Sequence, residues 1–111
     1  MELTDVQFKE SVFDYETAAF KGAKPTVVDL YTDWCASCKA LSPTLDKLAQ
    51  KFEGKVDIMK VNITKADKLT EALEITGVPT ILFFHPGEAK PRNILVGSSA
   101  GKIEENIQLI L

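Results

Sequence analysis

The chain has 111 residues, 45% of them apolar and 26% charged, and a formal net charge of −3. This length predicts one domain over residues 1–111, with a core large enough to fold without a disulfide scaffold. Lysines and acids are interspersed, so no basic stripe indicates nucleic-acid binding, and the apolar run Ile81 to Phe84 is far too short to span a bilayer.

The first predicted elements are a helical region and a buried strand. Thr4 to Gln7 has the capping-box form, and apolar residues follow it, which predicts a helical region from Asp5 to about Phe20, or one broken near Asp14. Residues 26–32 are rich in β-branched and aromatic side chains, as in a buried strand.

The rest of the chain alternates between helices and strands. Apolar residues at spacings of three and four predict a helix from Cys35 to about Phe52, with Pro43 inside it. The later predictions are a strand over 56–63, a helix over 66–75 ended by Gly77, strands over 80–84 and 92–96 joined by a turn, and a last helix capped by Ser98 or Ser99. This order predicts an α/β fold with a mixed central sheet and helices on both faces.

The only two cysteines, Cys35 and Cys38, flank the junction between the first buried strand and the following helix. Backbone N–H groups and the helix dipole favour an anion at a helix N-terminus, and the anionic thiolate is the form of cysteine that attacks disulfides. We expect Cys35 to be the partly exposed nucleophile. Cys38 lies one turn on, in line with the apolar stripe, so we expect it to be buried, to pair with Cys35 under oxidation and to resolve the mixed disulfide.

Two other uses of the cysteines are a metal site and a structural disulfide in a binding module. A zinc site needs about four ligands, and the only further cysteine or histidine is His85, which sits in a predicted surface turn. The C-x-x-C spacing therefore favours thiol–disulfide exchange, and turnover on a protein disulfide separates it from the binding module.

Two residues near the cysteines also stand out. Asp29 is a carboxylate inside an apolar strand; burial without a partner raises the pKa of such a group and makes it a candidate proton shuttle for Cys38, the alternative being a solvated or paired carboxylate. Trp34, directly before Cys35, is either a platform that shields the thiolate and contacts substrate or an ordinary core residue.

The element order and five landmarks together resemble the thioredoxin family over nearly the whole chain. The landmarks are the strand leading into Trp34-Cys35-Ala36-Ser37-Cys38, the helix proline Pro43, the strand lysine Lys60, the loop Gly77-Val78-Pro79-Thr80 and the glycine Gly97. The resemblance implies a thioredoxin-like fold and an enzyme, a thiol–disulfide oxidoreductase that reduces protein disulfides.

The resemblance also implies roles for single residues and partners. It makes Asp29 the proton shuttle with Lys60 beside it, although Lys60 could equally extend into water. It places Trp34, Val78, a cis Pro79 and Gly97 in the substrate groove. It implies no bound cofactor or metal, because the dithiol carries the two electrons. The expected partners are disulfide-bearing proteins and an electron donor, either a thioredoxin-reductase-like protein or a membrane protein.

The Ala36-Ser37 pair departs from the Gly-Pro of the classical family pattern and leaves the redox potential open. The stretch from Asp29 to Cys38 is also similar to the C-terminal domain of bacterial membrane proteins that relay electrons to the periplasm. Because no signal peptide is visible, we expect a cytoplasmic monomer that binds no membrane, or a periplasmic domain if the chain is excised from such a relay.

Overall fold

The computed structural model describes residues 1–97 and 99–111. Within them five strands form one mixed sheet in the spatial order β1, β5, β4, β6, β7. The strands span Glu2–Leu3 (β1), Thr26–Tyr31 (β4), Asp57–Asn62 (β5), Thr80–Phe84 (β6) and Asn93–Val96 (β7). The helices span Asp5–Ser11 (α1), Ala36–Lys51 (α2), Asp67–Ala72 (α3) and Ala100–Ile110 (α4).

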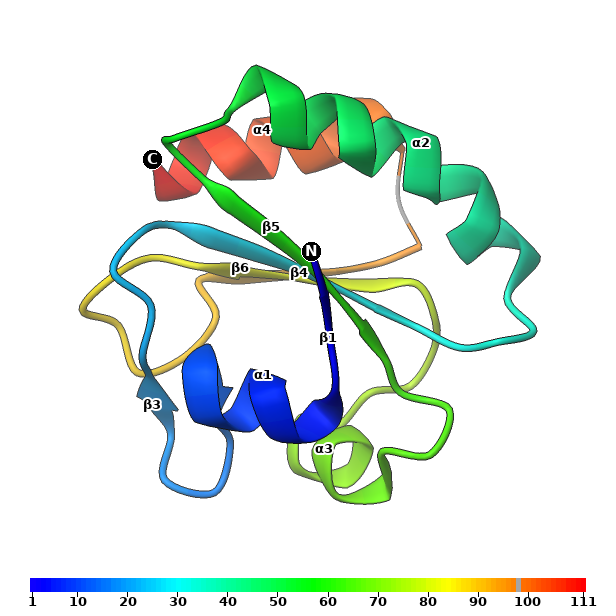
Figure 1. The fold of residues 1–111 in the computed structure, drawn as a ribbon, viewed down its shortest axis with the longest axis vertical. Coiled ribbons are helices and arrows are strands. Elements are labelled where there is room, and N and C mark those ends of the chain that lie inside the picture. Colours follow the sequence, from blue (N-terminus) through cyan, green and yellow to red (C-terminus); the bar gives the residue numbers. More distant parts are fainter. Residues whose placement is uncertain (98) are drawn as a thin grey trace.

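The sheet is the middle layer of three. Strands β1, β5 and β4 run parallel to one another, and β6 runs antiparallel to both β4 and β7. Helices α2 and α4 cover one face, while α1 and α3 lie on the other (Figure 1). The predicted α/β fold with a mixed central sheet is therefore confirmed.

Each face of the sheet has its own apolar core. Val27 points to the α2–α4 side, where it packs with Leu45 and Ile107, whereas its neighbour Val28 packs with Phe8 on the α1 side. Successive strand residues point to opposite faces, so a strand buried on both faces is apolar almost throughout. Burial of each such side chain stabilises the fold by about 1.5–3 kcal/mol, and this fixes β4 at the centre of the molecule.

The predicted first helical region is only partly correct. Helix α1 begins at Asp5 with the capping box of Thr4 and Gln7 but ends at Ser11. A short antiparallel pair follows it, β2 (Phe13–Asp14) and β3 (Ala19–Phe20). The aromatic rings explain the change, because Phe13 and Phe20 both pack against Phe84 of the central sheet, with ring centroids 5.2 and 5.0 Å away. Burying both rings there is incompatible with one continuous helix.

The predicted glycine cap of the third helix is wrong. Helix α3 ends at Ala72, and the chain leaves it through Glu74 in the left-handed region, at φ 54°. The Ile75 N–H then donates to the Thr70 carbonyl, which closes the helix before Gly77 is reached. The last helix is capped by Ser99, one of the two predicted serines, while Ser98 lies outside the described residues.

Candidate active site

The junction between β4 and α2 presents Cys35 as the N-cap of α2. The Cys35 Sγ accepts a hydrogen bond from the Cys38 backbone N–H at 3.1 Å and lies 3.4 Å from the Ser37 hydroxyl. A cap residue takes an extended backbone and turns its side chain onto the free N–H groups of the first turn. The first sulfur therefore sits where the helix stabilises a negative charge.

Cys35 and Cys38 form the intramolecular disulfide that their spacing predicts. Their exposed fractions are 8% and 4%, so the first is the more accessible, as expected, but the predicted partial exposure of Cys35 is wrong for this oxidised form. The Cys35–Cys38 disulfide brings the two residues together at the start of α2.

Trp34 is 85% exposed, which excludes the alternative of core packing. Its side chain lines an open hollow of about 440 Å³ together with Val78 and Thr32. An exposed aromatic ring beside a reactive sulfur offers apolar contact area to a docking chain.

The loop before β6 places the remaining predicted groove residues together. The Val78–Pro79 peptide bond is cis, and the Pro79 carbonyl accepts a hydrogen bond from the Gly97 N–H at 2.8 Å. Among the described residues, the Val78 N–H and C=O have no hydrogen-bond partner. They are available to an extended chain that lies along the loop.

Asp29 lies on β4 behind Cys38 and is 2% exposed. Its Oδ1 atom has no hydrogen-bond partner within the described residues. Burial raises the pKa of Asp29 to about 6, although the positive charge of Lys60 lowers it in part. The buried, unpaired carboxylate predicted from the sequence is therefore present.

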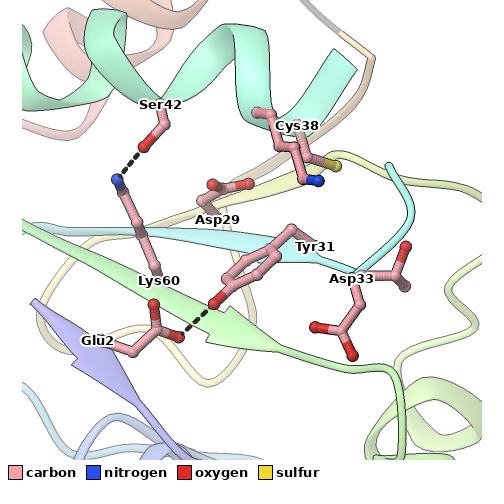
Figure 2. A pocket seen from close by; sticks show the side chains of 9 residues that line it. Glu2, Asp29, Tyr31, Asp33, Cys38, Ser42 and Lys60 are labelled. Atoms are coloured by element: carbon pink, nitrogen blue, oxygen red, sulfur yellow. Dashed lines mark hydrogen bonds between the residues drawn. The ribbon is translucent and has the colours of Figure 1, made fainter. Parts of the chain in front are cut away.

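Asp29 faces a cavity of about 230 Å³ that also reaches Cys38 and Lys60. Figure 2 shows the Asp29 carboxylate between Lys60 and Cys38. The Lys60 ammonium donates to the Ser42 hydroxyl and, at 3.3 Å, to Asp46, so it lies beside Asp29 without bonding it. The Lys60 side chain is only 19% exposed, which excludes the alternative in which it extends into water.

A polar cluster that the sequence analysis did not identify holds the chain just before Trp34. The Asp33 N–H donates to the Thr64 hydroxyl at 3.0 Å, Thr64 donates to the Asn62 side-chain oxygen at 2.7 Å, and the Asn62 amide donates to the Asp33 carboxylate at 2.7 Å. This closed set ties the active-site loop to the end of β5. Polar residues after a strand are too common for sequence reasoning to find it.

The described residues contain no group of three or more His, Cys, Asp and Glu side chains that could hold a metal ion. His85, the one histidine, lies after β6, and its Nδ1 is 2.8 Å from the Ile110 carbonyl oxygen at the end of α4. None of the helices in residues 1–97 and 99–111 combines the length and apolar character needed to cross a membrane.

Comparison with known proteins finds a family and relatives that match nearly the whole chain. The family model described as Thioredoxin matches residues 2–109. A thioredoxin of Borreliella burgdorferi is 37% identical over 110 residues, covering 96% of this chain and 92% of that protein. Thioredoxin C-2 of Corynebacterium nephridii is 36% identical over 111 residues, covering 94% and 93% of the two chains.

Proposed function

Because the chain belongs to the thioredoxin family and is a thiol–disulfide oxidoreductase, we propose that it works as a reductant of protein disulfides, with Cys35 as nucleophile and Cys38 as resolving cysteine. The observation that carries these assignments is the capping geometry, in which the Cys38 N–H donates to Cys35 Sγ at the start of α2. Only the first sulfur has this support for a thiolate.

The reaction proceeds in two exchanges. The Cys35 thiolate of the reduced protein attacks one sulfur of the substrate disulfide; a Cys35–substrate disulfide forms, and the other substrate sulfur leaves as a thiolate that takes a proton from water. The Cys38 thiolate then attacks Cys35, which forms the Cys35–Cys38 bond and releases the second substrate thiol. The substrate gains two electrons and the protein dithiol loses them.

Asp29 is proposed as the base for the second exchange. Cys38 is buried, so its proton needs an acceptor inside the molecule, and the Asp29 carboxylate shares its cavity. A pKa of about 6 leaves Asp29 mostly ionised near neutral pH yet basic enough to accept a proton. Lys60 lines the same cavity, and we assign to it the stabilisation of the ionised carboxylate.

The substrate is proposed to dock as an extended segment beside Trp34 and the loop before β6. Support comes from the exposed Trp34 ring, the unpaired Val78 backbone groups and the link between Pro79 and Gly97. Backbone pairing recognises any extended chain, so it suits a protein that acts on many different disulfide-bearing partners.

We propose a monomer that uses no bound cofactor or metal, since the dithiol itself carries the electrons, and that is re-reduced by a thioredoxin-reductase-like protein in the cytoplasm. Two relatives described as thioredoxins, each matched over more than nine-tenths of its length, support this setting over a membrane relay. Re-reduction by a membrane donor in the periplasm is the alternative that the Ala36-Ser37 pair keeps open.

The reduction potential of the Cys35–Cys38 couple tests the proposed direction. Equilibration of the protein with glutathione buffers of known ratio, followed by quantification of the two free thiols, gives this value. A reductant requires a potential near the about −270 mV of thioredoxin. A value near about −120 mV, typical of a strong oxidant, contradicts the proposed function.

A further inference from the structure

The N-terminal strand brings a second carboxylate toward the Asp29 cavity. In the sheet register Glu2 on β1 lies opposite Lys60 on β5, and Lys60 lies opposite Asp29 on β4. Residues directly opposite one another on neighbouring strands point to the same face of a sheet. The three side chains therefore form a row, with a cation between two acids, on the face that carries Cys38.

Tyr31 holds Glu2 in this row. Its hydroxyl donates a hydrogen bond to the Glu2 carboxylate at 2.8 Å (Figure 2). Burial and the hydrogen bond to Glu2 raise the pKa of Tyr31 to about 12, so the hydroxyl keeps its proton throughout the pH range in which Asp29 titrates. Tyr31 follows Asp29 by two residues on the same strand and so lies on the same face.

The Glu2–Tyr31 pair forms a wall between two hollows. Both residues line the Asp29 cavity, and both also line a second, larger hollow of about 520 Å³ next to the start of α1. The pair therefore separates the buried carboxylate from the more open surface around Thr4 and Lys65. A charged group at this position acts on Asp29 through the cavity.

Several ionisable groups face Asp29 besides Glu2. They are Tyr31 and Asp33 from β4 and its following loop, Cys38 and Lys39 from α2, and Lys60 from β5. Lys60 is held by Ser42 and Asp46 of α2, and the antiparallel neighbour of Asp29 on β6 is the apolar Ile81. The charge of Glu2 raises the pKa of Asp29 and opposes the effect of Lys60.

We propose that Glu2, held by Tyr31, is a positioning residue that adjusts the protonation equilibrium of Asp29, which burial dominates, and thereby the pH range in which Cys38 is deprotonated for the resolving step. This inference rests on the proposed role of Asp29 as base. It makes the first strand part of the redox machinery, although that strand contributes no atom to either sulfur exchange.

The test compares Glu2→Gln with Glu105→Gln, which also removes one negative charge but from the exposed face of α4. The first measurement is the titration of the Asp29 carboxyl carbon by NMR in the oxidised proteins. Glu2→Gln should move the Asp29 midpoint to lower pH by at least about 0.3 unit, which is a twofold change in the ratio of charged to neutral carboxyl. Glu105→Gln should leave it unchanged.

The second measurement is the resolving step itself. When the reduced protein reacts with a chromogenic aromatic disulfide, the first thiol is released by Cys35 and the second by Cys38, so the two exchanges appear as separate phases. The pH midpoint of the second phase should fall in Glu2→Gln by the same amount as the Asp29 titration. A second phase that behaves as in Glu105→Gln overturns the role of Glu2.

Asp29→Asn separates failure of this inference from failure of the proposed function. If Asp29→Asn removes the pH dependence of the second phase but Glu2→Gln matches the control, only the role of Glu2 is overturned. If Asp29→Asn leaves that pH dependence intact, Asp29 is not the base, and the proposed function loses that step together with this inference.

Tyr31→Phe tests the holding role of the hydroxyl. Loss of the hydrogen bond should let Glu2 move toward water, so the Asp29 midpoint should shift in the same direction but less than in Glu2→Gln. In the Glu2→Gln background Tyr31→Phe should add no shift. An equal shift in both backgrounds shows that Tyr31 acts on Asp29 without Glu2, which overturns this part of the proposal.

Discussion

Asp29 is an acidic residue in an environment that disfavours its charged form. It is buried, and Oδ1 has no partner among the described residues. Burial raises the pKa of this carboxyl from 3.8 to about 6. Between these two pKa values the folded protein keeps a proton that the unfolded chain has already released. The free energy of unfolding therefore falls as the pH rises through this range.

We expect Asp29→Asn to make the oxidised protein more stable at high pH. Below about pH 4 the carboxyl is protonated in both states and costs nothing. As the pH rises to about 6 and beyond, ionisation of the carboxyl lowers the free energy of unfolding. The total loss approaches about 3 kcal/mol, which corresponds to a pKa shift of about two units. The amide has no such pH dependence, so its advantage in the free energy of unfolding should grow over this range.

Denaturant unfolding at a series of pH values from 4 to 8 measures this difference, with Glu10→Gln on the exposed surface of α1 as a control. The control should follow the parent protein at every pH. If Asp29→Asn were less stable than the parent at pH 8, the carboxylate would instead be held by a stabilising native pairing.

At the scale of elements, the Asp33–Asn62–Thr64 set connects the active-site loop to the sheet. The Thr64 hydroxyl accepts from the Asp33 backbone and donates to Asn62, so Thr64→Val removes two of the three bonds while keeping the shape. We expect a loss of about 1 kcal/mol in the free energy of unfolding, because two hydrogen bonds are lost while the exposed Asp33 N–H can bond water instead. Since Trp34 and Cys35 follow directly, turnover on protein disulfides should also fall.

Thr64→Ser is the matched control, since it keeps the hydroxyl and loses only a methyl group. Unfolding curves and turnover on a protein disulfide should place Thr64→Ser close to the parent protein. Equal turnover of the Val and Ser variants would show that the loop keeps its position without these bonds.

The elements differ in how well the sequence predicts them. Strands β4 and β6 are largely apolar segments buried on both faces, and α2 has a long apolar stripe, so their local patterns suffice. Strands β1, β2 and β3 have two residues each, too few to show an alternation, and they exist because of what they pack against. Phe13 and Phe20 illustrate this, since only the position of Phe84 explains why they leave the helical pattern.

At the scale of the whole molecule, the site depends on long-range register. Motif spacing and apolar context mark the cysteines and Asp29 in the sequence, and the resemblance to the thioredoxin family marks Pro79. The row of Glu2, Lys60 and Asp29 could not be found from the sequence, because it arises only when the first residues add to the edge of the sheet beside β5. Strands β1 and β7 form the two edges of the sheet, and Figure 1 shows β1 leading from the N-terminus into α1.

The same assembly explains why two chemically identical cysteines have different proposed roles. The N-terminus of α2 stabilises a negative charge on Cys35. Strand β4 places the Asp29 carboxylate in the cavity that Cys38 also lines. Neither environment exists in the isolated motif. The different roles of the two cysteines therefore depend on the whole fold and not on residues 35–38 alone.

The measurement that tests these roles most directly is mass spectrometry of Cys38→Ser after reaction with a disulfide-bearing protein. The first exchange survives in this variant and the resolving thiol is missing, so a mixed disulfide through Cys35 should accumulate while turnover stops. Cys35→Ser should form no such adduct through Cys38. Repeated turnover of Cys38→Ser at the parent rate, or adducts of equal yield on Cys38 in Cys35→Ser, would contradict the assignment of the two cysteines.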